Sequence, residues 1–165
     1  ADSLASVLPT IRSRCVSFAV APVSPVDCAR YCTAQGVEKK AAALYSELFD
    51  GHIGTVLAAA RDEARMAQVE KAMELARDAA ARDSYAAAVL LAGYEKDRAG
   101  AAALLTDFRA VAAAGLRGSS HAPLQGREAQ RALRLAESAI RNLNGNSNPK
   151  ITLAVLAAKL GPAGQ

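Results

Sequence analysis

Aromatic residues are scarce in this chain of 165 residues: tryptophan is absent, and aromatic side chains make up 4% of the sequence. Large rings therefore cannot fill the core, and alanine dominates the 52% of residues that are hydrophobic. Alanine is the strongest helix former, and its small side chain lets helices pack closely. The composition predicts an all-α fold, and the length allows one ordinary domain or two small helical ones with a buried core.

Side chains that bind metals are also few. The two histidines, His52 and His121, occur in unrelated parts of the chain, and there are three cysteines. Cys28 and Cys32 are four residues apart, which places two thiols on one face of a helix, but a metal site would need further ligands. We therefore expect no metal site and interpret these thiols as buried, reduced and structural, which favours a cytoplasmic protein.

Neither the net charge nor a long apolar run of the sequence indicates a nucleic-acid or membrane partner. The formal net charge is +4, but basic residues are interleaved with acidic ones, so the sequence falls short of a nucleic-acid-binding footprint. No signal peptide is visible, and no apolar run approaches the roughly 18 residues of a membrane helix, so we expect no membrane partner. The chain opens with Ala1 instead of methionine, and we expect it to be an excised fragment of a longer protein.

The motifs of a self-contained enzyme are missing as well. The sequence has no Gly-x-x-x-x-Gly-Lys-Ser/Thr loop to hold phosphates, and it has no paired carboxylates near a nucleophile. We expect this fragment to bind no cofactor and to have no catalytic site of its own.

Helix boundary signals divide residues 23–62 into three short helices. Ser24-Pro25 provides an N-cap and a proline at the first helical position, and Gly36 is placed to end that helix in the left-handed conformation. A second helix is predicted over residues 37–49, and a third begins near Ile53. Three such helices make a small bundle.

The pattern from Asp62 onward predicts longer helices. An apolar stripe of Tyr85, Val89 and Ala92 is expected to face inward, and Gly93 or Gly100 is expected to interrupt the run. Residues 101–114 continue at helical spacing, and residues 115–126 form the longest expected loop. Two well-defined helices follow, the last of which is capped by Asn148-Pro149.

The N-terminal stretch carries the candidate functional residues. Residues 8–14 read Leu-Pro-Thr-Ile-Arg-Ser-Arg, and the apolar residues 16–23 follow, which predicts a charged loop that returns into a strand containing a buried Cys15. A rigidly held guanidinium can stabilise charge on a phosphoryl group in a neighbouring subunit. On spacing alone, ordinary solvated arginines remain the simpler interpretation of Arg12 and Arg14.

The order of these features resembles a known family. Ser13-Arg14-Cys15, a three-helix bundle, a longer helical region and Asn146-Ser147-Asn148-Pro149 before an aliphatic helix are similar to the delta-prime subunits of bacterial DNA polymerase III clamp loaders. The resemblance implies a remnant of an AAA+ nucleotide-binding core at 1–22, a lid domain at 23–62 and a helical collar domain at 63–165. In this family the collar helices of five subunits form a closed ring.

The residue at position 54 distinguishes the delta-prime subunits from the gamma/tau subunits, which they resemble most. The ATP-hydrolysing gamma/tau subunits have an arginine at the matching place in the third lid helix, where it reaches the nucleotide in cis, and glycine offers no cation there. The resemblance then implies a non-hydrolysing subunit whose Arg14 acts as a finger in trans, in the assembled complex only, on ATP bound by a partner. Arg12 is the fallback for that role. The implied partners are gamma/tau and delta subunits through the collar, and the sliding clamp and primed DNA indirectly.

Two alternatives stay open. The first is the C-terminal part of a gamma/tau ATPase subunit, which Gly54 disfavours. The second is an unrelated helical adaptor domain whose opening motif matches by chance. The adaptor hypothesis predicts that residues 1–22 form an ordered part of the helical fold, whereas the clamp-loader hypothesis predicts that they project from it or pair artificially because their parent sheet is missing.

Overall fold

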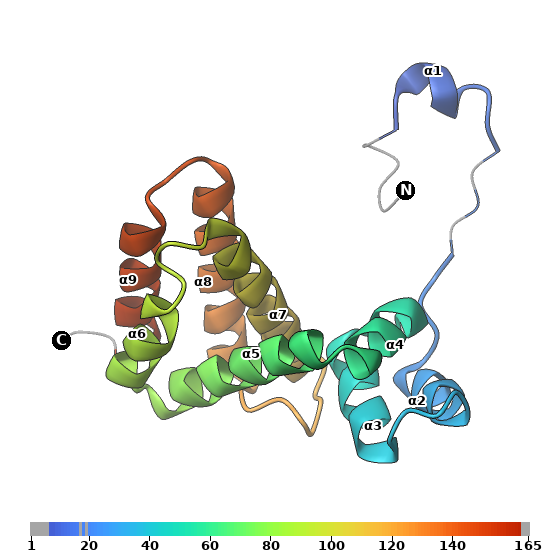
Figure 1. Cartoon of the computed structure of the whole chain (residues 1–165), viewed down its shortest axis with the longest axis horizontal. Coiled ribbons are helices and arrows are strands. Elements are labelled where there is room, and N and C mark those ends of the chain that lie inside the picture. Colours follow the sequence, from blue (N-terminus) through green and yellow to red (C-terminus); the bar gives the residue numbers. More distant parts are fainter. Residues whose placement is uncertain (1–6, 17, 19, 163–165) are drawn as a thin grey trace.

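The structure of the chain is a computed structural model that describes residues 7–16, 18 and 20–162. Over these residues it contains nine helices and no strand, which confirms the all-α fold (Figure 1). The helices are α1 (Pro9–Arg12), α2 (Pro25–Ala34), α3 (Lys39–Leu48), α4 (Ile53–Arg61), α5 (Glu63–Ala81), α6 (Ser84–Ala92), α7 (Arg98–Leu116), α8 (Gly126–Asn144) and α9 (Pro149–Leu160).

Helices α2, α3 and α4 pack on one another as a small bundle. Its first helix begins and ends as the sequence predicts: the Ser24 side chain accepts a hydrogen bond of 3.1 Å from the backbone N–H of Asp27, and Gly36 adopts a φ of 89° after the last turn. Cys28 and Cys32 are fully buried in the core of this bundle. Burial, together with the neighbouring Cys28, raises the pKa of the Cys32 thiol to about 11, which keeps it protonated.

The larger bundle consists of α5 to α9. Helix α7 packs against both α5 and α8, while α9 packs against α8 and α6 (Figure 1). The buried side of α7 includes Leu104, Leu105, Phe108 and Val111, as the helical spacing predicts. Asp62 separates the two bundles: it follows the last residue of α4, and its side chain caps α5 by accepting a 2.9 Å hydrogen bond from the N–H of Ala64.

Within the described part of the chain, α7 is the one helix long and apolar enough to cross a membrane by length and composition. Its most apolar window has a mean hydropathy of 1.3, and half of that window is buried inside the protein. The helix owes this hydropathy to alanine and leucine side chains that form the core between α5 and α8. Its setting is that of a core helix.

The break in the long helical region does not fall at Gly100. The chain turns at Arg82, which adopts a left-handed φ of 56°, and Asp83 then caps α6 by accepting a 2.9 Å hydrogen bond from the N–H of Ala86. Gly93 follows the last residue of α6, as expected, whereas Gly100 lies inside α7. The N–H of Gly100 donates to the capping carboxylate of Asp97, so this glycine belongs to a helix start and not to an interruption.

The predicted loop and strand at the N-terminus are also wrong. Pro9 begins a short helix, and the described residues among 16–23 are neither helix nor strand. Val16, Phe18 and Val20 are exposed, and Cys15, which was expected to be buried, is exposed too. A β-branched run forms a strand only where a neighbouring strand can accept its hydrogen bonds, and the described residues contain none.

The stripe that was expected to face inward on α6 faces outward. Tyr85 is 78% exposed and Val89 is 59% exposed, and Ala92 is exposed beside them. The inner face of the helix is instead formed by Ala87 and Leu91, which pack toward α9 and α5. Because α6 is apolar on both sides, periodicity alone could not tell its inner face from its outer one.

Candidate functional site

The two candidate arginines lie on a segment that stands apart from both bundles. Arg12 is the last residue of α1, and Arg14 lies in the turn that follows, where its backbone N–H donates a 3.0 Å hydrogen bond to the carbonyl of Ile11 (Figure 1). Ser13 donates from its hydroxyl to the carbonyl of Thr10 at 3.2 Å, which closes the turn locally. Both arginines are exposed, and neither makes an ion pair with any residue that the structure describes.

The N-terminal segment meets the small bundle beside the start of α4. Residues 20–23 lie against the start of α4, and together they line a shallow surface hollow. At this contact Gly51 adopts a φ of 73°, and a β-carbon at its position would collide with the carbonyl of Val23. Gly51 thereby lets two backbones approach closely and fixes where the N-terminal segment leaves the bundle.

The start of α4 lacks a cation, as the sequence indicates. Gly54 lies in the first turn, and the space where its side chain would stand is open. His52 occupies the N-cap position of this helix but makes no side-chain capping hydrogen bond. The helix start therefore offers exposed backbone and an imidazole, and Gly54 adds no side chain to it.

A buried ion pair crosses the larger bundle close to the small one. The side chain of Asp107 on α7 is 4% exposed. Its carboxylate accepts hydrogen bonds from both terminal nitrogens of Arg65 on α5, one of them at 2.5 Å, and a third hydrogen bond from the amide of Gln68 at 2.7 Å. The guanidinium of Arg65 also lies 5.6 Å from the ring centre of Phe49. The hydrogen bonds to Asp107 and the charge of Asp107 outweigh partial burial and raise the pKa of Arg65, so the guanidinium stays charged.

A second polar cluster joins the end of α3 to the loop between α7 and α8. Glu47 accepts from the hydroxyl of Ser119 and lies 2.9 Å from Nδ1 of His121. Arg117 donates to the backbone carbonyl of Glu47 at 3.0 Å, and its Nε lies 3.3 Å from the carboxylate of Asp50. These contacts satisfy the free carbonyls at the C-terminus of α3 with a cation, which is favourable for a helix end.

Burial alone would raise the pKa of Glu47. The hydrogen bonds from His121 and Ser119, together with the charge of His121, outweigh that effect and hold the pKa of this carboxyl below its usual range. Sequence reasoning missed both polar clusters because their members are far apart in the chain. Asp107 alone left a signal, since it interrupts the apolar face of α7 between Leu105 and Phe108.

The two clusters border an open cleft of about 490 Å³ between the bundles. Acidic and basic side chains alternate along its walls, and Arg65 and Asp107 are already paired there, as are Arg117 and Asp50. The cleft therefore presents no excess of either charge to a ligand. We interpret this cleft as part of the contact between the two bundles and not as a ligand site.

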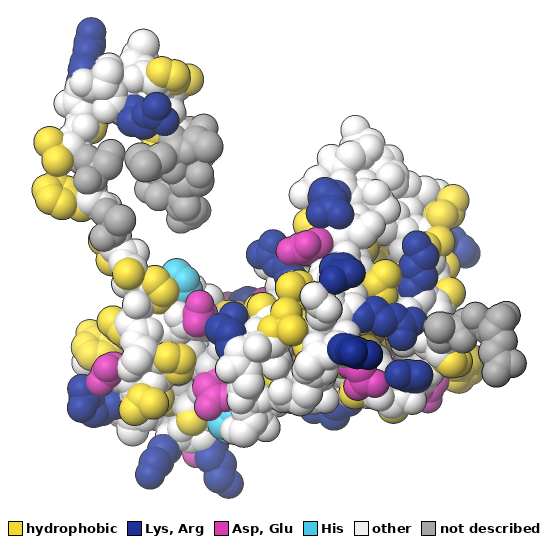
Figure 2. All heavy atoms as spheres, turned by 180° about the vertical axis from the view of Figure 1, so that it is seen from behind, with side chains coloured by type: hydrophobic (Ala, Val, Ile, Leu, Met, Phe, Trp, Pro, Cys, Tyr) yellow, Lys and Arg dark blue, Asp and Glu magenta, His cyan; other side chains and the backbone are white. Residues whose placement is uncertain are grey.

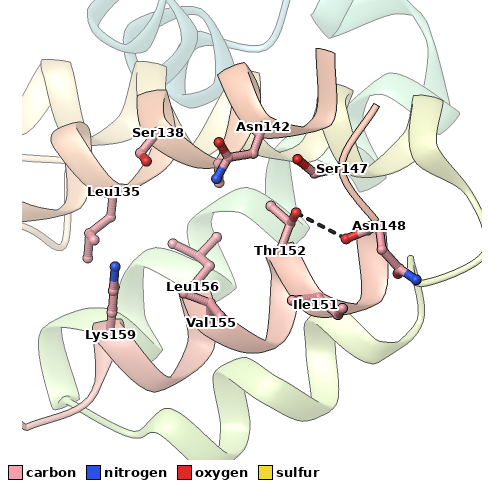
Figure 3. Close-up of a pocket in the computed structure, with 11 residues that line it drawn as sticks. Leu135, Ser138, Asn142, Ser147, Asn148, Ile151, Thr152, Val155, Leu156 and Lys159 are labelled. Carbon is pink, nitrogen blue, oxygen red and sulfur yellow. Dashed lines mark hydrogen bonds between the residues drawn. The ribbon is translucent and has the colours of Figure 1, made fainter. Parts of the chain in front are cut away.

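A groove runs between α8 and α9 and encloses about 380 Å³ (Figure 3). Leu135 and Asn142 line it from α8, and Ile151, Val155 and the side chain of Lys159 line it from α9. At one end Thr152 donates a 3.0 Å hydrogen bond to the backbone carbonyl of Asn148. Sequence analysis gave α9 as an aliphatic helix, but it gave no indication that part of its apolar surface stays uncovered.

Helices α6 and α9 pack side by side and share an apolar outer surface, which we call the α6–α9 outer face. Helix α6 is apolar on all sides, and α9 is apolar except for Lys150, Thr152 and Lys159. Helices with apolar residues on all sides are normally covered on all sides. The exposed residues of the outer face are Tyr85, Ala88, Val89 and Ala92 on α6 and Ala154 and Ala158 on α9.

No group of histidine, cysteine, aspartate and glutamate side chains in the described residues could hold a metal ion. Comparison with protein families, with curated proteins and with solved structures found no match to this chain.

Proposed function

We propose that this chain is the lid and collar part of a non-hydrolysing, delta-prime-type subunit of the bacterial DNA polymerase III clamp loader, a cytoplasmic complex of DNA replication. The observation that carries the proposal is the placement of Ser13-Arg14-Cys15. This motif is exposed on a separate segment directly ahead of a three-helix bundle, and a larger helical bundle with an uncovered apolar face follows.

In this proposal Arg14 acts on a neighbour's nucleotide. Arg14 lies in a short turn whose backbone is hydrogen-bonded, and its exposed guanidinium has no counter-ion among the described residues, so it is available to an external anion. In the assembled complex it would stabilise the charge that develops as ATP on a gamma-type subunit is hydrolysed, and that hydrolysis is coupled to loading the sliding clamp on primed DNA. Trans-acting arginines of this kind contribute about 10³ to 10⁵ in rate at the site they serve.

The assignment to the non-hydrolysing type rests on the start of α4. A gamma/tau-type ATPase subunit would need an arginine at position 54, and glycine supplies neither charge nor hydrogen-bond donors from a side chain. No atom of another described element lies within 4 Å of the place where a β-carbon would stand at Gly54.

Assembly is assigned to the α6–α9 outer face. Burying its tyrosine, valine and alanine side chains against gamma/tau or delta subunits would remove apolar surface from water, and small side chains let a partner helix approach closely. The face lies in the larger bundle, away from α1, which Arg14 follows in the chain, so assembly and the finger role can be tested separately (Figure 1).

The test is hydrolysis in the reconstituted clamp loader. The full-length subunit containing this chain would be mixed with gamma-type and delta subunits, clamp and primed DNA, as wild type, Arg14→Ala and the matched control Arg12→Ala. We expect Arg14→Ala to lower stimulated ATP hydrolysis with assembly intact, and Arg12→Ala to leave it unchanged. A loss with Arg12→Ala only would move the finger to Arg12. Unchanged hydrolysis in both variants would remove the finger assignment, and absence of assembly with wild-type protein would contradict the clamp-loader function itself.

A further inference from the structure

The groove between α8 and α9 leaves branched aliphatic side chains uncovered at its edge. Ile151 is 63% exposed and Val155 is 46% exposed, and both border the groove (Figure 3). The buried residues Leu156 and Ala139 also line it. Ser138 and Asn142 add polar groups on the α8 side. A groove with aliphatic side chains along its α9 side, and with polar groups along α8 and at the Ser147–Asn148 end, is suited to an amphipathic helix of another protein.

The rim of this groove is basic. Arg134 and Arg141 are exposed on α8, four residues before and three residues after Ser138, so they lie along the same edge of the helix. Lys159 lines the groove itself from α9. None of these three side chains makes an ion pair with another described residue, and Figure 2 shows lysine and arginine side chains gathered over the larger bundle.

Glu137, the acidic residue between Arg134 and Arg141 on α8, lines the cleft between the bundles and not this groove, and two further charged groups near the groove are already engaged. Arg131 donates to the backbone carbonyl of Gly161 at 2.8 Å and ties α8 to the end of α9. Lys150, at the other end of α9, pairs with Glu95 at 3.4 Å. The unpaired charge along the trough is therefore positive.

We propose that this groove binds an amphipathic helix of another protein, whose aliphatic stripe fills the trough and whose aspartate or glutamate residues face Arg134, Arg141 and Lys159. The shape favours a helix because α8 and α9 present the parallel ridges into which a third helix can pack, over the roughly 18 Å length of α9. A nucleic acid would suit the basic rim, but its phosphates would gain nothing from Ile151, Val155 and Leu156, and no aromatic side chain lines the groove for base stacking.

This inference does not depend on the clamp-loader proposal. It concerns the trough between α8 and α9, whereas ring assembly is assigned to the α6–α9 outer face. A result at the groove therefore leaves the role of Arg14 undecided, and a result on ATP hydrolysis leaves the groove undecided.

The probe is a stapled helical peptide of about 15 residues, with leucines at helical spacing on one face and glutamates on both flanks. Its twin carries lysines in place of the glutamates. Fluorescence anisotropy with this chain should show that the glutamate peptide binds at least about tenfold more tightly than the lysine peptide. The chain carrying Arg134→Glu and Arg141→Glu should reverse this preference.

Two further variants locate the site. Ser138→Trp places a bulky ring in the trough and should abolish binding of the glutamate peptide, whereas Tyr85→Glu on the α6–α9 outer face should leave it unchanged. Circular dichroism of each variant checks that the helices are intact. The proposal is overturned if neither peptide binds, if both bind equally, or if Ser138→Trp binds like wild type. It is also overturned if only a single-stranded oligonucleotide binds and loses affinity with the two arginine substitutions.

Discussion

Arg65 and Arg14 carry the same guanidinium in opposite surroundings. The guanidinium of Arg65 pairs with a buried carboxylate, which also accepts from an amide side chain, and it lies over an aromatic ring. Its charge is therefore neutralised within the fold. That of Arg14 is exposed beside a short helical turn and meets no carboxylate of the described residues. One arginine serves stability, and the other stays exposed to solvent.

Removing Asp107 should therefore be costly. In Asp107→Ala the guanidinium of Arg65 and the amide of Gln68 lose their shared acceptor, and breaking one side of a buried ion pair typically costs about 3–5 kcal/mol. Because the Arg65 side chain is 27% exposed and can turn toward water, we expect about 2–4 kcal/mol, measured as the loss of free energy of unfolding in urea.

The matched control is Glu74→Ala. Glu74 pairs with Lys71 on the exposed side of α5, and a surface pair is worth less than about 1 kcal/mol. Equal destabilisation by the two substitutions would show that the Asp107 pair is no more than a surface contact.

Local residue signals could be read from the sequence, whereas pairings between distant residues could not. The caps at Ser24 and Asn148 act within one helical turn, so the residue type and its position are enough to predict them. Arg65 and Asp107 are 42 positions apart, and the ion pair exists only because α5 and α7 pack side by side. Nothing in a single sequence specifies which carboxylate such a helix pair brings to a given arginine.

At the scale of elements, the connection between α3 and the loop after α7 determines how the two bundles are held. The C-terminal end of α3 presents free carbonyls and the carboxylate of Glu47. Arg117 of the loop donates to a carbonyl, and Ser119 and His121 contact the carboxylate. The predicted loop at residues 115–126 is thus an ordered docking segment, a role that its glycine and serine content did not indicate.

This connection should weaken in acid. The pKa of Glu47 is lower in the folded chain than its ordinary value of 4.5, so its contribution to stability is present above that value and is lost as the pH falls through the folded pKa. We expect Glu47→Gln to lower the free energy of unfolding at pH 7 and to have a smaller effect once the pH is well below 4.5. Urea denaturation of both proteins across this range measures the difference. An effect of the substitution that is independent of pH would contradict the ionised role of Glu47.

The elements that sequence analysis misjudged share one cause. Residues 16–23 have strand propensity but no partner strand among the described residues, and α6 is apolar on its inner and outer sides alike. In both cases the local pattern is compatible with burial against something beyond the described fold. Both segments leave apolar side chains exposed in the described part of the chain.

For the whole molecule, the α6–α9 outer face should decide whether the chain joins a ring. Replacing Tyr85 and Val89 together by glutamate puts two charges on a face that we expect to be buried in the assembly, and their unpaired burial would strongly oppose association. Native mass spectrometry with the gamma-type and delta subunits should show loss of the complete complex, while the variant chain remains helical on its own because both side chains are exposed. Complete assembly with this double variant would exclude the outer face as the interface.

The three cysteines differ in their accessibility to solvent, so one of them can be labelled selectively in the native sequence. Cys28 and Cys32 are shielded inside the small bundle, whereas Cys15 is exposed next to Arg14. A maleimide dye should therefore attach selectively beside the proposed finger without any engineered cysteine. Its fluorescence would then report, in real time, when a nucleotide-bearing neighbour approaches Arg14.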